Sequence, residues 1–326
     1  AFLPARCRPM LIATNSLSKR YGSFAALAEC SLGVREGEVF GLLGPNGAGK
    51  TTFLRLLLGF IRPTSGSATI AGLDCVRDSI AVREKTAYLP GEARLFRRMS
   101  GRRVLDFFSR LRPACRRSEA EEVARRLDLD LSRQVARMST GMRQKLALAA
   151  VLATDADLVI LDEPTANLDP TARGEVLELV REVRSRGRTV VFSSHVLSEV
   201  EETCDSVAIL RAGRLVHEQQ IADIRRSHRI TARLAEPLGE IPFALREQVR
   251  LVAESAGAVV LEAAESLAPL LGWLGTLAID EVLIEPVGLS AIYDRFHREH
   301  ASDASTTAAL ARLAAHSGRP TAAVEG

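Results

Sequence analysis

The sequence predicts an α/β fold, with a mixed β core that carries a helical subdomain and a small second α/β domain after it. An apolar run at 39–43 leads through a glycine-rich turn into an apolar helical pattern at 52–58, which is the order strand, turn, helix. Continuous apolar runs at 158–161 and 189–192 are typical of parallel strands that are covered on both faces. A shift toward Ala, Leu and Glu after about Asp223 indicates the second domain.

Composition restricts the class of protein. The chain has 326 residues, of which 47% are hydrophobic and 25% charged, the balance of a globular protein with room for one large and one smaller domain. A net charge of +3 favours no particular partner. Five scattered cysteines without a C-x-x-C pair indicate reduced thiols in a cytosol. Because no apolar run approaches the roughly 20 residues of a spanning helix, another protein must cross the membrane if this one works there.

Four segments are expected. The residues before Met10 lack the apolar core of a signal peptide, so they are treated as a possible non-native extension, with Met10 as a candidate start. The Ala/Ser/Thr-rich end of the chain has little to bury and is expected to be disordered. The expected segments are the extension at 1–10, a main domain at 11–222 with a helical subdomain at about 80–155, an accessory α/β domain at 223–300 and a tail at 301–326.

Periodicity and turn residues place the elements in order. Short β-type runs surround the glycine-rich turn, helical spacing prevails from about Ser79 to Thr154, and parallel-strand patterns then return. Ser118, three residues before Glu121, predicts a capping box at one helix start. The predicted strands are 11–17, 29–34, 39–43, 68–70, 158–161, 189–192, 206–210, 215–216, 259–261 and 279–284, and the predicted helices are 52–58, 104–111, 118–127, 141–152, 177–183, 267–274 and 289–297.

The glycine-rich turn has the complete pattern G-x-x-x-x-G-K-[ST]. Its glycines let backbone N–H groups face a polyphosphate, and the helix start that follows adds unpaired donors and a positive dipole end. We expect Lys50 to reach the β- and γ-phosphates, and the Thr51 hydroxyl to ligate Mg²⁺. A chance glycine-rich turn is the alternative, and the flanking strand and helix argue against it. The predicted phosphate-binding residues are Gly44, Pro45, Asn46, Gly47, Ala48, Gly49, Lys50, Thr51 and Thr52.

An acid pair, Asp162-Glu163, follows the apolar run at 158–161. After a phosphate-binding loop, such a pair completes a nucleotide site, because the aspartate holds Mg²⁺ and the glutamate points at the attacking water. A solvated pair in a turn is the simpler alternative for these two residues alone. We therefore expect Asp162 as a metal ligand beside Thr51, and Glu163 as a catalytic residue.

A serine and a glycine at a helix start, within 138–145, resemble the signature motif of ATP-binding cassette (ABC) ATPases. The segment 166–169 looks like the D-loop of that family, His195 like its switch histidine, and Tyr21 like the aromatic residue that stacks on adenine. Each feature has a simpler explanation alone: a helix cap, a strand-end histidine, a turn aromatic. Their joint order over 11–216 makes the resemblance specific for about two-thirds of the chain.

The resemblance implies a P-loop NTPase fold of the ABC type, with ATP and Mg²⁺ as cofactors. Glu163 would orient the attacking water, and His195 would contact the γ-phosphate. Two copies of the chain would face head to tail, with each ATP between the phosphate loop of one copy and Ser139 and Gly141 of the other. Asp169 belongs to the nucleotide-binding residues in this arrangement.

The resemblance also implies a transport partner. The segment 284–293 looks like the end of drug-exporter ATPase subunits. The expected function is therefore ATP hydrolysis that drives export through a separately encoded transmembrane permease, by ATP-dependent dimer closure, at the cytoplasmic face of the membrane. Nucleic acid is not an expected partner. Import, a soluble ABC ATPase acting on ribosomes or DNA, and a regulatory ATP-binding subunit with weak hydrolysis are the alternatives.

Three positions, in two motifs, depart from the family pattern. Gly91 stands after Tyr88-Leu89-Pro90, where most relatives carry the glutamine that touches Mg²⁺ and couples to the permease. Either Glu92 substitutes by a shift of one residue, or this contact is missing, which puts the rate of hydrolysis in question. In the signature motif, Thr140 and Met142 replace the usual glycine and glutamine.

Nine arginines lie between Arg94 and Arg117, against one carboxylate, Asp106. A solvated helical face explains such a run. Contact with a permease loop or with anionic headgroups explains it equally well, because each basic side chain contributes about 1 kcal/mol at a membrane surface.

Overall fold

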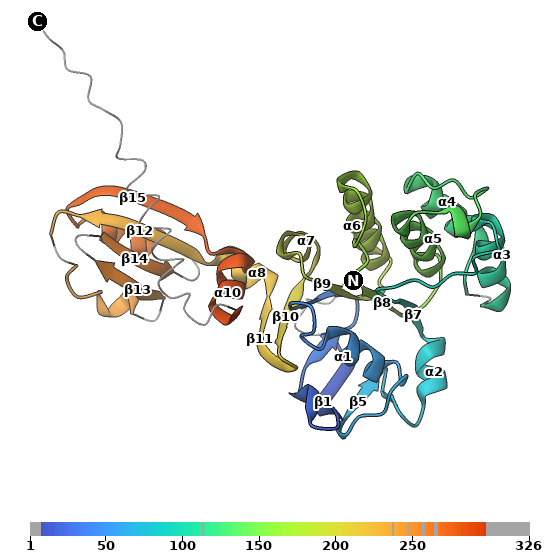
Figure 1. Cartoon of the computed structure of the whole chain (residues 1–326). Coiled ribbons are helices and arrows are strands. Elements are labelled where there is room, and N and C mark those ends of the chain that lie inside the picture. The colour runs from blue at the N-terminus through green and yellow to red at the C-terminus, as the bar shows by residue number, and fades with distance from the viewer. Residues whose placement is uncertain are drawn as a thin grey trace, which may run out of the picture. The chain divides into compact units, whose positions relative to one another are not determined.

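The computed structural model describes residues 8–297 except 113, 237, 247, 256–257 and 264–266. The expected tail at 301–326, and most of the expected extension at 1–10, lie outside these residues. The chain divides into two compact units, 1–218 and 219–326, and each is described by itself (Figure 1). In the described part of the chain, no helix is long and apolar enough to cross a membrane.

The first unit is built on a six-stranded sheet in which the five strands β10, β4, β9, β8 and β7 are parallel. All residues of β4, β8 and β9 are buried, as the continuous apolar runs predicted. Parallel strands end at one edge of a sheet, so the loops after β4, β8 and β9 lie close together. The spatial order is β11 (Arg214–Gln220), β10 (Ser206–Arg211), β4 (Val39–Leu43), β9 (Thr189–Ser194), β8 (Leu158–Asp162) and β7 (Thr86–Leu89).

A second, largely antiparallel sheet completes the core of this unit. Side chains from both sheets and from helix α1 (Lys50–Leu57) form one hydrophobic cluster, with Leu17, Phe53 and Ile160 among its buried members. This packing fixes α1 beneath the loop that precedes it. The strands are β2 (Phe24–Cys30), β1 (Met10–Tyr21), β5 (Ser65–Ile70) and β6 (Leu73–Asp74), and β3 (Gly33–Arg35) also pairs with β1.

Helices α3, α4 and α5 pack on one another at one end of the unit (Figure 1). Two expectations fail here. Residues 86–89, expected within a helical stretch, form strand β7 because this short buried segment pairs with the edge of β8. The capping box is absent: the helix begins at Arg117, so Ser118 lies inside its first turn, and Glu121 pairs with Arg117 instead. The helices are α2 (Ser79–Glu84), α3 (Gly101–Leu111), α4 (Arg117–Arg126), α5 (Thr140–Leu152), α6 (Pro170–Ser185) and α7 (Leu197–Thr203), with a 3₁₀ turn at Val135–Arg137.

The second unit is a four-stranded antiparallel sheet. Helix α9 covers one face, where Leu270 packs with Ile230 and Leu261. Two of its strands, β12 and β13, were not predicted, because their polar residues hide the alternation of a half-buried strand. The spatial order is β13 (Val249–Ser255), β14 (Ala258–Ala263), β12 (His228–Leu234) and β15 (Ile279–Pro286), with helices α8 (Ile221–Arg226), α9 (Ala268–Leu274) and α10 (Gly288–His297) and a 3₁₀ turn at Phe243–Leu245.

Candidate nucleotide-binding site

The loop between β4 and α1 requires glycine at its two ends. Gly44 has φ 156° and Gly49 has φ 107°, values that side-chain-bearing residues rarely adopt. A Cβ on Gly44 would lie 2.4 Å from the Leu210 carbonyl oxygen, and a Cβ on Gly49 would lie 2.7 Å from that of Ala26. Helix α1 begins at Lys50, directly after the loop. Its unpaired N–H groups therefore open toward the loop, which is the arrangement that binds anions.

Lys50 is held inside this loop. Its Nζ donates hydrogen bonds to the carbonyl oxygens of Gly44, at 2.7 Å, and Pro45, at 3.3 Å. The same ammonium lies 3.2 Å from Oε1 of Glu163. Only 5% of Lys50 is exposed, so its charge is fixed at the loop.

The carboxylate of Asp162, at the end of β8, accepts hydrogen bonds from two hydroxyl groups. Thr51 Oγ1 donates to Oδ2 of Asp162 at 2.9 Å, and Ser193 Oγ donates to Oδ1 at 2.6 Å. Asp162 and Ser193 are register partners on β8 and β9. Sequence reasoning missed Ser193, and the pairing of two strands that are distant in sequence was the signal needed to find it.

Glu163 is oriented by a strained backbone and by two side chains. Its φ of 50° is unusual for a residue other than glycine and costs about 1–3 kcal/mol. Its amide donates to the Ser193 hydroxyl at 3.0 Å. One carboxylate oxygen contacts Lys50, and the other lies 2.8 Å from Nδ1 of His195. Lys50, Thr51, Asp162, Glu163 and His195, which were predicted separately, thus meet in one network.

A cavity of about 250 Å³ opens beside the phosphate loop. It is lined by residues 45–52, by Glu163 and by Phe24 on β2. Tyr21 is not among its lining residues, although it pairs directly with Phe24 across the β1–β2 hairpin. Both rings are more than half exposed, so both offer aromatic surface at the same end of the hairpin. Sequence reasoning singled out Tyr21 and missed Phe24.

Ser139 and Gly141 lie at the start of α5, as predicted, but not at the cavity. Ser139 is exposed, and its Oγ accepts a hydrogen bond from the Met142 amide at 3.2 Å as the N-cap of the helix. A Cβ on Gly141 would lie 2.6 Å from the Asn167 carbonyl oxygen, so this position accepts only glycine without a shift of the backbone. One chain therefore does not bring the signature motif to its own phosphate loop.

Asp169 caps a different helix. Its carboxylate accepts from the Ala172 amide at 2.9 Å at the start of α6, and Lys145 lies 3.5 Å from it. The hydrogen bond from Ala172, followed by the charge of Lys145, lowers the pKa of Asp169. Gln144, which sequence reasoning missed, donates to the Pro164 carbonyl at 3.3 Å. These contacts tie α5 to the loop that follows Glu163.

The structure decides between the two explanations of Gly91. A Cβ at this position would lie 3.6 Å from Oδ2 of Asp162, so Gly91 occupies the place from which a longer side chain would reach the Asp162 carboxylate. Glu92 does not substitute: it pairs with Arg94 at 3.3 Å, and both side chains are more than 80% exposed. The side-chain contact expected here is missing.

Ion pairs and hydrogen bonds account for most of the nine arginines. Arg117 and Arg110 both pair with Asp106, for example. Among the described residues, the side chains of Arg97, Arg98 and Arg103 have no such partner. The prediction of a solvated face therefore fits six of the arginines. For Arg97, Arg98 and Arg103, contact with a permease loop or with anionic headgroups remains the alternative. The six are Arg94, Arg102, Arg110, Arg112, Arg116 and Arg117.

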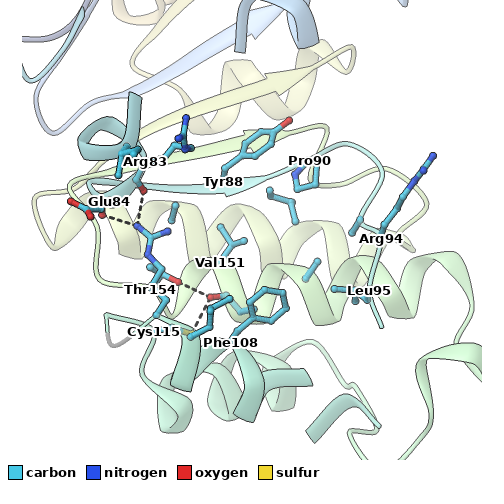
Figure 2. Close-up of a pocket in the computed structure, with 18 residues that line it drawn as sticks. Arg83, Glu84, Tyr88, Pro90, Arg94, Leu95, Phe108, Cys115, Val151 and Thr154 are labelled. Carbon is cyan, nitrogen blue, oxygen red and sulfur yellow. Dashed lines mark hydrogen bonds between the residues drawn. The ribbon is translucent and has the colours of Figure 1, made fainter. Parts of the chain in front are cut away.

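A second cavity, of about 560 Å³, lies between α2, β7, α3 and α5 (Figure 2). Its lining is mostly apolar, with Tyr88 and Pro90 from one side and Phe108 from the other. Burial, followed by the charge of Asp162, raises the pKa of Tyr88 to about 12, so its phenol stays protonated. Tyr88 lines this cavity, and its strand β7 pairs with β8, the strand that ends at Asp162. Sequence reasoning missed the cavity because five separate segments line it.

Comparisons with known proteins agree with this geometry. The model of the ABC transporter family matches residues 27–166. A daunorubicin resistance ATP-binding protein of Streptomyces coeruleorubidus is 40% identical over 64% of this chain and 67% of its own length. An ABC transporter ATP-binding protein of Bacillus subtilis is 35% identical over 63% of this chain and 85% of its own length.

The chain belongs to the ABC transporter ATP-binding proteins. The solved structure of an ATP-binding subunit of an ABC transporter matches this ABC ATPase with a TM-score of 0.60 and 30% identity, over 66% of this chain and 92% of that one. A dimeric ATP-binding cassette bound to ADP and Pi shares the fold, with a TM-score of 0.57 and 21% identity over 64% of this chain and 98% of that one. The predicted family, P-loop NTPase fold and enzyme class are confirmed.

Proposed function

We propose that this ABC ATPase binds and hydrolyses ATP in the cavity beside the phosphate loop, and that hydrolysis drives export through a separately encoded permease at the cytoplasmic face of the membrane. One observation carries the proposal: a phosphate-binding lysine, a hydroxyl–carboxylate pair, a strained glutamate and a histidine form one contact network. Phosphoryl transfer depends on positioning and charge stabilisation by such groups. Resistance to daunorubicin in the name of a relative supports export.

ATP binding follows from the loop and the hairpin. Amides of the loop and of the first turn of α1 hold the phosphates, and Lys50 compensates their charge. Phe24 lines the cavity, and Tyr21 lies opposite it on the hairpin, so we assign the adenine to this aromatic pair. Thr51 and Asp162 present oxygen atoms 2.9 Å apart, and such ligands, together with phosphate oxygens, suit Mg²⁺. When bound, Mg²⁺ would neutralise charge that develops on the phosphates.

Glu163 prepares the attacking water. Before nucleotide binds, Lys50 and His195 engage both of its carboxylate oxygens. Phosphates at the loop give Lys50 a competing anion, so Oε1 becomes available to accept a hydrogen bond from water. His195, whose side chain is half exposed, then lies beside both Glu163 and the γ-phosphate.

Ser139 and Gly141 complete the site of a second copy. They open helix α5 at an exposed position away from their own cavity, and a helix N-terminus with an exposed serine hydroxyl binds anions. A head-to-tail dimer brings them to the γ-phosphate of the partner's ATP. Hydrolysis removes that bridge, so the ATP state controls closure. Asn167 and Asp169 lie against the same end of α5 and belong to this interface.

The permease docks at the cavity in Figure 2. Its apolar lining and its exposed rim residues Ile80 and Leu111 suit the apolar face of a short helix from a membrane protein. The segment 88–91 leads from Tyr88 and Pro90 in the cavity lining to Gly91, where a Cβ would lie 3.6 Å from Oδ2 of Asp162. Docking there can therefore influence the metal ligand through the backbone.

A single substitution tests the hydrolytic role. Glu163→Gln keeps the shape of the side chain but removes the charge that polarises water, so turnover should fall about 10²–10⁴-fold. ATP binding, measured by equilibrium titration, should persist because Lys50 and the loop are intact. Turnover at the wild-type rate in this variant would contradict the assignment of Glu163.

A regulatory ATP-binding subunit with weak hydrolysis is a second candidate, favoured by the missing side chain at Gly91. Gly91→Gln tests it, with Glu92→Gln as the matched control on the exposed neighbour. If the missing contact limits the rate, Gly91→Gln raises Mg²⁺-dependent ATP hydrolysis several-fold and Glu92→Gln does not. Fast hydrolysis by the wild type, unchanged in Gly91→Gln, would remove this candidate.

A further inference from the structure

A buried carboxylate outside the contact network joins the two loops that carry the catalytic side chains. Glu199 lies in the first turn of α7 and is only 5% exposed. Its Oε2 accepts hydrogen bonds from Thr165 Oγ1 at 2.8 Å and from Ser194 Oγ at 3.1 Å. One oxygen atom thus connects the loop after β8 with the end of β9.

Both donors are close in sequence to the residues that would act on ATP. Thr165 is two residues after Glu163, and Ser194 directly precedes His195. The Ser194 hydroxyl also accepts from the Val196 amide at 2.9 Å, so it fixes the chain on both sides of His195. Glu199 therefore holds the two segments whose side chains meet at the 2.8 Å contact between Glu163 and His195.

The burial of this carboxylate is costly. Its second oxygen, Oε1, is buried without a hydrogen-bond partner, and no Lys or Arg of the described residues forms an ion pair with Glu199. A buried charge that is not compensated destabilises the folded state, and such a group in a native structure calls for an explanation. An apolar side chain would fill the same space at a lower cost, so packing alone does not explain a buried group whose oxygen accepts two hydrogen bonds.

We propose that Glu199 is a positioning residue for ATP hydrolysis, which keeps Glu163 and His195 at the distance that the reaction needs. Glu163 has a strained backbone, and strain persists only where the surrounding structure fixes the residue. The hydrogen bond to Thr165 supplies that restraint on one side, and the hydrogen bond to Ser194 aligns the histidine. This role rests on the hydrolytic function proposed above.

Steady-state kinetics of the full-length chain test the role. Glu199→Ala should lower kcat about 10- to 100-fold, because small displacements of catalytic groups have effects of this size. The dissociation constant for ATP should stay within about twofold, because Lys50 and the loop are untouched. Glu199→Gln keeps a carbonyl oxygen that can accept both hydroxyls, so it should recover most of kcat. Glu202→Ala is the matched control: it removes a glutamate from the same helix, but one that is exposed and paired with Arg181.

A double-mutant cycle separates positioning from simple stabilisation. If Glu199 acts through the two hydroxyls, the combination of Thr165→Val and Ser194→Ala should lower kcat as much as Glu199→Ala does. Adding Glu199→Ala to that pair should then change kcat little. Glu199→Ala with a lower melting temperature but wild-type kcat, or full additivity with the hydroxyl pair, would overturn the proposal.

Hydrogen exchange supplies a readout that does not depend on activity. In Glu199→Ala, peptides that cover 160–166 and 192–197 should exchange faster, while the peptide that covers 44–52 should keep its wild-type rate. A wild type that fails to hydrolyse ATP would contradict the proposed function, yet these exchange rates would still decide whether Glu199 fixes both loops. Unchanged exchange in both peptides would overturn the inference.

Discussion

The phosphate loop and the signature helix belong to one nucleotide site in the proposal, yet one chain treats them differently. Around the loop, Lys50, Asp162 and Glu163 are joined by contacts of 2.6–3.3 Å to neighbouring groups. At the start of α5, here called the signature helix, Ser139 is exposed, and within the described part of the chain its hydroxyl is bonded only to the Met142 amide of its own helix. One half of the site is assembled within the chain, and the other half is presented outward. In the proposal, this difference lets a single chain bind ATP, and hydrolysis requires a second copy.

The largest effect is expected at the assembled half. Lys50→Ala removes the buried ammonium from the loop and leaves Glu163 without its cation, so ATP affinity should fall at least about 100-fold. Titration with a fluorescent ATP analogue measures this loss. Lys85→Ala is the control, since Lys85 is a half-exposed lysine that pairs with Asp157 at 3.6 Å. Near-normal ATP affinity in Lys50→Ala would contradict the assignment of ATP binding to the phosphate loop.

A substitution at Ser139, in the half of the site that faces outward, should change turnover and not ATP affinity. Ser139→Glu places a carboxylate where the γ-phosphate of the partner's ATP would lie, so turnover should fall about 100-fold by loss of a donor and by repulsion. ATP affinity of the single chain should stay within about twofold, because its own cavity is intact. Ser100→Glu is the control, since Ser100 caps the neighbouring helix α3 in the same way. A loss of affinity equal to that of Lys50→Ala would show that Ser139 serves its own loop.

A substitution in the second unit should lower the stability of the protein without changing its turnover. Glu262 pairs with Arg229 at 2.8 Å and Arg295 at 2.9 Å. Burial opposes ionisation, but these arginines outweigh it and hold the pKa of Glu262 below its ordinary value of 4.5. Glu262→Gln should therefore lower the free energy of unfolding by about 1–3 kcal/mol at neutral pH without changing the turnover of the folded protein.

The sign of the pH dependence follows from this lowered pKa. The stabilisation by Glu262 is present above its unfolded pKa and is lost as the pH falls through its folded pKa. The difference in melting temperature between wild type and Glu262→Gln should therefore shrink below about pH 4.5. A difference that grows on acidification would contradict the pairing, and a loss of turnover in the folded variant would give this unit a part in hydrolysis.

The same contrast separates what the sequence could predict from what it could not. Gly44, Lys50 and Thr51 lie within eight consecutive residues, so their chemistry is visible in a short motif. The same holds for Asp162-Glu163 and for the start of α5 at Ser139. Ser193 and Glu199 contact residues that are distant in sequence, Asp162 and Thr165, and the parallel pairing of β8 and β9 brings these segments together.

The elements that the sequence failed to show were short or half-polar. Strand β7 has four residues and gains its place by pairing with β8. The predicted N-cap at Ser118 was wrong because α4 begins one residue earlier, at Arg117. Arg117 pairs with Glu121 one turn later, and Arg116 pairs with the distant Asp155, and both ion pairs favour this earlier start. Local propensity decides such ends only where tertiary contacts do not.

A mixing experiment tests the division of the site most directly. Lys50→Ala and Ser139→Glu are each expected to be inactive alone, and ATP hydrolysis is measured after the two proteins are combined in equal amounts. In a head-to-tail dimer, the intact loop of the Ser139→Glu copy faces the intact signature helix of the Lys50→Ala copy, so each mixed dimer holds one complete site. Half of the dimers are mixed, which predicts recovery of up to about a quarter of the wild-type rate. A mixture no more active than the two separate proteins would contradict a site shared between two copies.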